Sequence, residues 1–333
     1  MIQAAIVGTG KTSKRYAQHL LKAGQAEIFG IYDDDEVNAQ ELAAEYGCRA
    51  FSSFERLMEA LPTGSVLVVA EPEDSDKHSI LQALKSGYHV IAGMQGYRLG
   101  DIQELLASVS SSSGGRLLFA NPERFYYHNR DLKKRIEDGA IGSLGMINSK
   151  RYCPLIPDDD VGVPIIDGGA ALNRLALKEI DLLRWIAGEV DTVYAMRASI
   201  RPLDYVLVTL QFRSGVIANL EAYSGYPGAY TSAVEYAGSK GVIRYDNRKT
   251  NAFHVHRRAD SDVNPGTRGF SPSFRNPEYD NLVHMLDCLD KDKEPAMTVE
   301  DAFETMRVVA AASQSLHTGQ PVNLFSEGVG NDA

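Results

Sequence analysis

The first third of the chain alternates between short apolar runs and helix-like patterns, and this alternation restricts the possible folds more than any other feature. Apolar runs stand at residues 4–7, 27–32, 65–70, 88–92 and 116–120, and helical periodicity fills most of the segments between them. Strands and helices that alternate at this spacing are typical of a parallel sheet with helices on both faces. The sequence therefore predicts an α/β domain built on a doubly wound parallel sheet over residues 1–120.

The pattern changes after about residue 121, where several β-rich runs follow one another without helices between them. These runs stand at residues 192–200, 205–212, 216–223, 233–237 and 242–245, with helical patterns at 130–138, 171–187 and 299–317. Consecutive strands joined by short turns indicate antiparallel pairing. Residues 121–333 are therefore expected to form a C-terminal α+β domain with an open, mostly antiparallel sheet.

Length and charge agree with this division and exclude some partners. A chain of 333 residues with 44% hydrophobic residues is long enough for two packed domains. Its net charge of −10 would repel a nucleic-acid backbone or an anionic membrane surface. No stretch approaches the roughly 20 apolar residues that span a bilayer. We therefore expect neither nucleic acid nor a membrane as a partner.

The cysteines and the N-terminus indicate a cellular compartment. Cys48, Cys153 and Cys288 are widely separated and form no C-x-x-C pair, so neither a disulfide framework nor a structural zinc site is predicted. The first residues lack the basic and long apolar segments of a signal peptide. The sequence therefore favours a protein of the reducing cytoplasm, with no metal site.

A glycine motif follows the first predicted strand and opens the first predicted helix. Its residues are Gly8, Thr9, Gly10, Lys11, Thr12 and Ser13. Two glycines permit a tight turn and close approach of the backbone to a pyrophosphate, which the helix N-terminus stabilises through its N–H groups. Ser13 stands where a third glycine is usual, and a residue of this size still packs. The motif predicts dinucleotide binding, and the alternative is a strand–turn–helix unit without a ligand.

The Gly-Lys-Thr letters inside this motif do not indicate the phosphate loop of nucleoside triphosphatases. That loop requires a glycine five positions before Gly10, where this chain has Ala5 inside the predicted strand. The residues between would then include Ile6 and Val7 in place of a flexible loop. The nucleoside triphosphatase interpretation therefore fails.

Acidic residues at the end of the second predicted strand bear on the choice of cofactor. A carboxylate at Asp33 can accept hydrogen bonds from the ribose hydroxyls of adenosine. Together with Asp34 and Asp35 it would repel the 2′-phosphate of NADP. The sequence therefore favours NAD as the cofactor over NADP. The alternative for Asp34 and Asp35 is a solvated acidic turn that caps the following helix.

Further short motifs, taken in order, resemble one protein family. They include Ala5-Ile6-Val7-Gly8-Thr9-Gly10, Val68-Val69-Ala70-Glu71-Pro72, Arg124-Phe125, Gly168-Gly169, Asp181-Leu182-Leu183-Arg184-Trp185 and Gly319-Gln320-Pro321-Val322. Over nearly the whole chain this order is similar to that of the glucose-fructose oxidoreductase, inositol dehydrogenase and rhizopine-catabolism family (Gfo/Idh/MocA).

The resemblance implies a fold, an activity and a cofactor. It implies an N-terminal Rossmann domain that binds NAD or NADP, and an enzyme that oxidises or reduces sugars, cyclitols and related compounds. It places Ala70, Glu71 and Pro72, and also Gly93 and Met94, near the cofactor. It further implies self-association through the open sheet, as a homodimer or homotetramer.

The chain departs from the family at the expected catalytic positions. The resemblance implies a Glu-Lys-Pro motif after the strand at 88–92, where this chain has Gly93, Met94 and Gln95. It also implies an Asp-x-x-x-His pair on the helix after the double glycine, where this chain has Arg174 and Lys178. The lysine and the histidine that would position the substrate and move its hydroxyl proton are therefore both replaced.

Helical periodicity suggests where the replacing residues lie. At about 100° per residue, one polar face of the helix contains Arg174, Lys178, Asp181 and Trp185. In the resembled family this face lines the pocket. Two cations there suit a carboxylate or phosphate on the substrate. Lys178 is also a candidate for the base itself. The alternative is a solvated face with a Lys178–Asp181 pair.

The expected function is that of an NAD-linked oxidoreductase. Its substrate is a small sugar-like or polyol molecule, with Arg174, Lys178 and Asp181 as the catalytic candidates. The alternative is a divergent family member: a cofactor-binding sensor or subunit, or an enzyme that uses bound NAD for elimination or hydrolysis. The acidic run that begins at Glu71 is expected to weaken cofactor binding.

Overall fold

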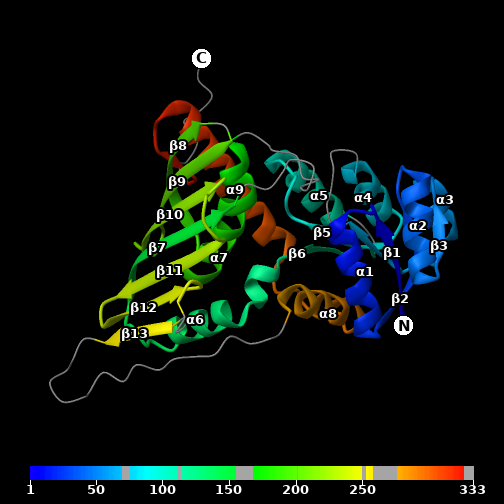
Figure 1. Ribbon diagram of the computed structural model, residues 1–333, viewed down its shortest axis with the longest axis horizontal. Helices are drawn as coiled ribbons and strands as arrows, with labels where there is room; N and C mark the ends of the chain where they lie inside the picture. The colour runs from blue at the N-terminus through cyan, green and yellow to red at the C-terminus, as the bar shows by residue number, and fades with distance from the viewer. Residues whose placement is uncertain are drawn as a thin grey trace. The chain divides into compact units, whose positions relative to one another are not determined.

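The computed structural model describes residues 1–69, 76–111, 114–154, 168–200, 202–249, 253–257 and 276–325 (Figure 1). The chain divides into two compact units. Among the described residues, the first unit contains those up to 125 together with 276–303, and the second contains 126–257 together with 304–325. Each unit is built on its own β-sheet.

A parallel sheet of six strands forms the centre of the first unit, in the order β3-β2-β1-β4-β5-β6. The strands are β1 (Ile2–Val7), β2 (Ala26–Tyr32), β3 (Arg49–Phe51), β4 (Val66–Val69), β5 (His89–Gly93) and β6 (Leu117–Ala120). The order runs outwards from β1 and β4 in opposite directions, so the predicted doubly wound sheet is confirmed. In such sheets ligands bind beyond the carboxyl ends of the strands where the order reverses.

Helices connect these strands. They are α1 (Lys11–Ala23), α2 (Glu36–Tyr46), α3 (Phe54–Ala60), α4 (Asp76–Lys85) and α5 (Leu99–Ser111), followed after β6 by a 3-10 turn, η1 (Pro122–Phe125). Helix α1 begins directly after the glycine motif, as predicted. The motif therefore lies at the carboxyl edge of the sheet, next to the point where the strand order reverses.

Helix α8 (Pro277–Asp290) also belongs to the first unit. Its Leu282, Met285 and Leu286 are buried in the same apolar cluster as Leu20 of α1. The structural division therefore differs from the predicted boundary near residue 120, because a late helix returns to the first sheet. Helix α9 (Val299–Thr318) begins in the first unit and ends in the second.

The second unit contains a mixed sheet in the order β13-β12-β11-β7-β10-β9-β8-β14. Its strands are β7 (Leu144–Cys153), β8 (Val190–Ile200), β9 (Leu203–Phe212), β10 (Ile217–Ser224), β11 (Thr231–Gly238), β12 (Gly241–Asp246), β13 (Phe253–Arg257) and β14 (Val322–Asn323). Strands β7 and β10 are parallel, and the other neighbouring strands of this sheet are antiparallel. This confirms the predicted α+β class with a mostly antiparallel sheet.

The described helices of this unit lie on one face of the sheet, and none of them covers the other face, which is called the open face below (Figure 1). The covering elements include α6 (Tyr127–Glu137), the π-helix η3 (Ala171–Ala176) and α7 (Leu177–Ala187). Along β10, Ala218, Leu220 and Ala222 are buried, whereas the residues between them are half-buried. This alternation is typical of an antiparallel sheet with one covered face.

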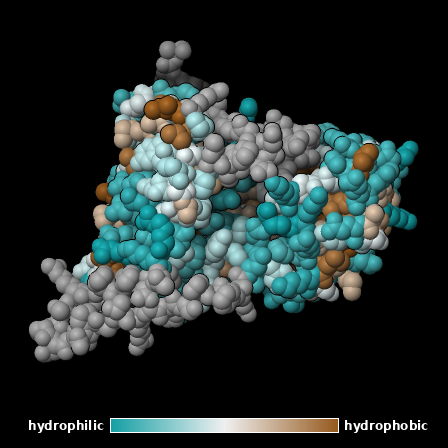
Figure 2. All heavy atoms as spheres, in the orientation of Figure 1, coloured by the Kyte–Doolittle hydropathy of each residue, from teal (hydrophilic) through white to brown (hydrophobic). Residues whose placement is uncertain are grey.

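The molecular surface is mainly polar. Figure 2 shows mostly hydrophilic residues on the visible side of both units, with hydrophobic residues in small groups. Within the described part of the chain, no helix combines the length and the apolar character needed to cross a membrane.

Candidate functional site

The glycine motif forms the turn between β1 and α1. Gly8 has a φ of 87°, in the left-handed region that favours glycine, and a Cβ there would lie 3.5 Å from the hydroxyl of Ser13. Ser13 is buried, so a small residue does occupy the place of the third glycine. Gly10 caps α1 and brings no side chain to the N–H groups of its first turn. Such a helix N-terminus suits an anion, so the residues present fit the pyrophosphate of a dinucleotide.

Asp33 lies beside the glycine motif. The hydroxyl of Thr9 donates a hydrogen bond to Oδ2 of Asp33 at 2.7 Å, and the backbone N–H of Asp35 donates to Oδ1 at 2.9 Å. The backbone N–H of Gly8 donates to the carbonyl oxygen of Tyr32 at 2.8 Å, so the two segments are also joined through the backbone. The carboxylate is thus in the position from which such residues bind the adenosine ribose.

The neighbouring acidic residues have structural roles. The side chain of Asp35 accepts hydrogen bonds from the N–H groups of Val37 and Asn38 and so caps α2. The side chain of Asp34 accepts a hydrogen bond from the hydroxyl of Tyr32. The alternative of a helix cap is therefore confirmed for Asp35.

The end of β5 holds the residues that replace the Glu-Lys-Pro motif. Gly93 is the last residue of β5, and Met94 after it is buried. A methionine side chain has no exchangeable proton, so Met94 cannot replace a proton-carrying lysine. Contact of Gly93 and Met94 with a cofactor stays a prediction. The other predicted cofactor residues, Ala70, Glu71 and Pro72, lie outside the described residues.

The second glycine of the double glycine, Gly169, allows the carboxylate of Asp204 on β9 to lie close to the start of the next helix. Gly169 has a φ of 85°, and a Cβ there would lie 2.2 Å from the guanidinium of Arg197 and 2.5 Å from the carboxylate of Asp204. Asp204 is buried, accepts a hydrogen bond from the N–H of Ala171 at 2.8 Å and pairs with Arg197 at 2.6 Å. Asp204 on β9 therefore fixes the start of the helix that carries Arg174 and Lys178.

That helix begins with a π-helical segment. Arg174 lies in η3, and Lys178 lies in the first turn of α7; both side chains are half-buried. A π-helical turn holds more residues than an α-helical turn, so the residues before and after it are rotated relative to a regular helix. Single π-helical turns are frequent at functional sites.

The positive charges of Arg174 and Lys178 both affect the pKa of a third side chain in the second unit, the thiol of Cys153. Burial raises the pKa of the Cys153 thiol at the end of β7 above its ordinary value, and the positive charges of Lys178 and Arg174 offset only part of this rise. The structure therefore brings these two predicted site residues into one neighbourhood. The local positive charge suits an anionic group on a ligand.

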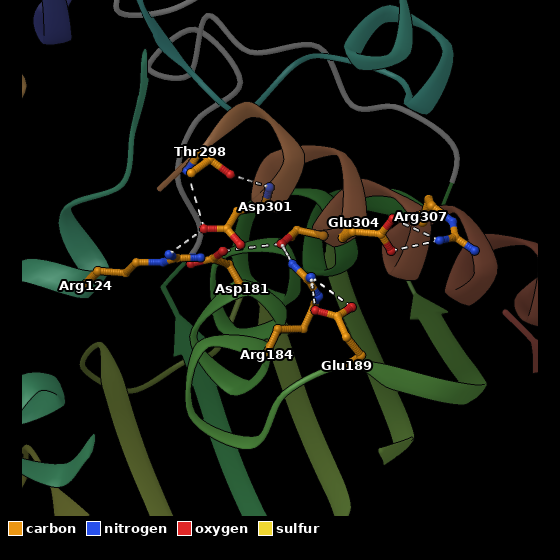
Figure 3. A network of polar contacts seen from close by, with 9 residues as sticks. Arg124, Asp181, Arg184, Glu189, Thr298, Asp301, Glu304 and Arg307 are labelled. Atoms are coloured by element: carbon orange, nitrogen blue, oxygen red, sulfur yellow. Dashed lines mark hydrogen bonds and ion pairs between the residues drawn. The ribbon is translucent and has the colours of Figure 1, made fainter. Parts of the chain in front are cut away.

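Asp181 has different surroundings. Its side chain is 0% exposed and accepts a hydrogen bond from the hydroxyl of Thr305 at 3.3 Å (Figure 3). Arg184 donates to the same hydroxyl at 2.8 Å and to Glu189 at 2.9 Å. The prediction that Asp181 shares an accessible face with Lys178 is therefore wrong, because α9 covers that side of α7. A catalytic role for Asp181 stays a prediction that this burial does not favour.

The sequence did not indicate the ion pair beside Lys178. Glu179 is buried, and its carboxylate accepts hydrogen bonds from Arg151 at 2.5 Å and from the hydroxyl of Ser149 at 2.6 Å. Arg151 also donates to the hydroxyl of Tyr230 at 3.0 Å. Because Arg151 and Ser149 are on β7, this pair anchors the helix that carries Lys178 to the sheet.

A neutral histidine lies next to this pair. The ring of His128 stacks on Tyr245 with centroids 4.1 Å apart and planes 6° apart. Burial and the positive charge of Arg151 lower the pKa of His128 to about 3. His128 therefore stays uncharged near neutral pH and adds no positive charge beside Arg151.

Two family sequence patterns match the chain, one in each sheet region. The pattern described as "Oxidoreductase family, NAD-binding Rossmann fold" matches residues 2–93. The pattern described as "Oxidoreductase family, C-terminal alpha/beta domain" matches residues 133–324. Together they contain the glycine motif, Asp33 and the helix with Arg174 and Lys178.

Several known proteins of similar sequence or structure are oxidoreductases. Glucose-6-phosphate 3-dehydrogenase of Bacillus subtilis (strain 168) is 31% identical, over 97% of this chain and 99% of the relative. Myo-inositol 2-dehydrogenase of Thermotoga maritima is 23% identical, over 97% and 98%. An oxidoreductase from Agrobacterium radiobacter, solved with NAD+, L-tartaric acid and magnesium, has the same fold, with a TM-score of 0.84, 17% identity and coverage of 97% and 98%.

Proposed function

Because the chain belongs to the Gfo/Idh/MocA oxidoreductase family and contains its NAD-binding Rossmann domain, we propose that it is an NAD-dependent oxidoreductase of sugar-like or polyol substrates that carry an anionic group. The cofactor, when bound, takes up or returns a hydride. The observation that carries the proposal is the pair of cations, Arg174 and Lys178, on one helical segment whose start is fixed by the Asp204 carboxylate.

Lys178 moves the proton of the reacting hydroxyl group. In the oxidative direction its neutral amine accepts the proton, and in the reductive direction its ammonium returns a proton to the oxygen. This assignment is supported by the buried methionine at Met94, which cannot move a proton. Glu179 and Arg151 hold the backbone next to Lys178 and so limit where the amine can reach.

Arg174 binds the anionic group of the substrate. A guanidinium presents paired N–H donors that match the two oxygens of a carboxylate or phosphate. The name of the relative glucose-6-phosphate 3-dehydrogenase supports a phosphate, and the tartaric acid bound to the Agrobacterium oxidoreductase supports a carboxylate. In the first unit, Asp33 favours NAD over NADP as the cofactor.

The test is a substrate screen in matched pairs, read out by NADH formation. Glucose 6-phosphate is compared with glucose, and an inositol phosphate with inositol, and we expect the charged member to have the higher kcat/KM. Lys178→Ala should lower kcat by about 10²- to 10⁴-fold. Arg174→Ala should raise KM for the charged member and leave the uncharged member unchanged. Lys134→Ala, at a side chain 72% exposed on α6, is the charge-matched control.

Other outcomes would support a different function. Equal turnover of charged and uncharged members, or full activity of Lys178→Ala, contradicts the roles given to Arg174 and Lys178. Tight NAD binding without turnover of any substrate would favour a cofactor-binding sensor or subunit. A dehydrated or hydrolysed product without net NADH would favour elimination or hydrolysis with transient use of bound NAD.

We also propose that the chain forms a homodimer or homotetramer through the open face of the second sheet. Met146, Met196 and Ile217 lie on that face and are 37%, 49% and 48% exposed. Ile217 and Met146 are register partners on β10 and β7, so their side chains are neighbours. Exposed apolar side chains that are adjacent on a sheet favour association with another surface.

The cytoplasm is the proposed compartment. Cys48, Cys153 and Cys288 are free thiols, which agrees with a reducing environment. Cell fractionation with a tagged chain tests this, and recovery in a secreted fraction would contradict it.

A further inference from the structure

We propose that Thr9 is a positioning residue that sets the preference of the cofactor site for NAD over NADP. Thr9 acts through Asp33, whose carboxylate it orients, and has no part in the transfer of hydride. This inference rests on the NAD-dependent function proposed above, and it extends that function to a residue of the glycine motif that lies between the two glycines.

The hydrogen bonds of Asp33 leave it suited to a ribose. An ionised carboxylate only accepts hydrogen bonds and has about four lone-pair sites, two on each oxygen. The hydroxyl of Thr9 uses one site on Oδ2, and the N–H of Asp35 uses one site on Oδ1. Among the described residues no other hydrogen bond takes the second site on either oxygen. The adenosine ribose of NAD presents two neighbouring hydroxyl groups, which match these two sites.

Backbone hydrogen bonds fix the place of Asp33, and the hydroxyl of Thr9 together with the N–H of Asp35 fixes the direction of its carboxylate. The N–H of Asp33 donates to the carbonyl oxygen of Phe51 on β3 at 3.4 Å, and the N–H of Gly8 donates to the carbonyl oxygen of Tyr32. These bonds hold the chain and leave the side-chain torsions free. Thr9 is β-branched and therefore stiff at its first torsion, so its hydroxyl is a rigid donor.

A cavity beside Thr9 makes the direction of the Asp33 carboxylate important. It has a volume of about 350 Å³ and lies between the glycine motif and α2, with Thr9, Lys14 and Asn38 among its lining residues. A 2′-phosphate would have both room and a cation there. Exclusion of NADP therefore depends on the charge and direction of Asp33 rather than on a lack of space. Glu41 and Glu45 line the same cavity and add to the repulsion.

The experiment measures the dissociation constants of NAD and NADP for the whole chain by calorimetry, without a substrate. Thr9→Val keeps the shape of the side chain and removes the hydroxyl. We expect it to weaken NAD binding about three- to tenfold, the worth of one hydrogen bond, and to leave NADP binding equal to that of the unsubstituted chain or stronger. Thr9→Ser should restore the preference. Thr63→Val, in an exposed turn, is the matched control.

A double-mutant cycle separates this role from a purely structural one. In an Asp33→Ala background, Thr9→Val should leave NAD affinity unchanged, because the partner of the hydroxyl is gone. An unchanged NAD preference in Thr9→Val, or an equal loss of NAD and NADP binding, would overturn the inference while leaving the NAD site intact. Failure of the unsubstituted chain to bind either cofactor would overturn the NAD site and this inference with it.

Discussion

Asp181 and Thr305 form a hydrogen bond between α7 and α9, inside the second unit. Arg184 donates to the same hydroxyl and to Glu189, so four side chains form one connected group. Three of these residues are buried, and a buried polar group without its partner costs more than the bond contributes when it is formed. The Asp181 carboxylate therefore stabilises the packing of the two helices.

Asp181→Ala should reduce stability without changing the chemical step. Loss of the acceptor should lower the free energy of unfolding by about 1–3 kcal/mol, because the hydroxyl of Thr305 and the guanidinium of Arg184 remain buried. Urea denaturation measures this loss, and Asp138→Ala at an exposed position is the control. A variant that keeps its stability and loses kcat would instead assign Asp181 to catalysis.

Glu179→Gln should be more destabilising, because it leaves the charge of Arg151 buried without its counter-ion. Removal of one partner from a buried ion pair costs about 3–5 kcal/mol. The double variant Glu179→Gln with Arg151→Met should recover much of that loss, as measured by urea denaturation. If the double variant is less stable than Glu179→Gln alone, the positive charge of Arg151 is balanced by another group and the assigned pairing is incorrect.

His128 should make the protein less stable in mild acid. The folded state lowers its pKa to about 3 from the ordinary value of 6.5. Below pH 6.5 the unfolded chain binds a proton that the folded chain does not, so stability falls as the pH falls towards 3. Between pH 7 and pH 5 this group should remove about 2 kcal/mol from the free energy of unfolding.

His128→Phe tests this assignment, because a phenyl ring can still stack on Tyr245. The variant should lose about 2 kcal/mol less than the unsubstituted chain between pH 7 and pH 5, by urea denaturation at each pH. The same pH dependence in both proteins would show that the acid sensitivity comes from other groups.

Ile217→Glu should dissociate the proposed oligomer. A carboxylate at this position, next to Met146, would be buried and unpaired in an interface between two open sheet faces. Sedimentation velocity should show a smaller particle than the unsubstituted chain, with the far-ultraviolet circular dichroism unchanged. Leu21→Glu, on an exposed residue of α1, is the control. An unchanged particle size would place the interface elsewhere.

Met94→Lys tests whether the site has lost an earlier function. Met94 is buried, so a lysine there should lower stability, and we expect no gain in turnover because Lys178 already moves the proton. Met94→Leu is the control for packing. If NADH formation appears only in Met94→Lys, the proton carrier is absent from the natural chain and Lys178 does not act as one.

The first sheet was predictable because its buried strands read as continuous apolar runs. Ala4, Ala5, Ile6 and Val7 of β1 are all buried, as are Val66–Val69 of β4. A parallel sheet covered on both faces requires such runs, and the glycine motif then fixes which loop binds the pyrophosphate. Local sequence therefore contained the buried strands of this sheet and the nucleotide side of the site, whereas β3, α3 and α8 were not predicted.

Strand β7 was not predicted, although it lies in the middle of the second sheet. Its covered positions include Ser149 and Arg151, which are polar, so the alternation of apolar and polar residues is interrupted. Both side chains are buried against Glu179, on a distant part of the chain, which accepts a hydrogen bond from each of them. A polar residue whose partner is remote in sequence gives no periodic signal.

The helical-wheel prediction for Asp181 was wrong for a different reason. It assumed one regular α-helix over residues 171–187, whereas the segment starts as a π-helix and α7 is buried on nearly all sides. The burial of Asp181 depends on α9, which periodicity within one segment cannot place. Arg174 and Lys178 were found through the resemblance, by counting back from the motif at residues 181–185, which depends on order and not on helical phase.

Helix α8 has a consequence for the order in which the protein is made. The ribosome releases β1 to β6 first, and it makes β7 to β13 before α8. Until then the apolar cluster that contains Leu20 and Leu118 lacks Leu282, Met285 and Leu286. The nucleotide-binding half is therefore incomplete during most of translation. A fragment that ends at Phe125 would keep this surface exposed and would be prone to aggregation, as unfinished folding units are.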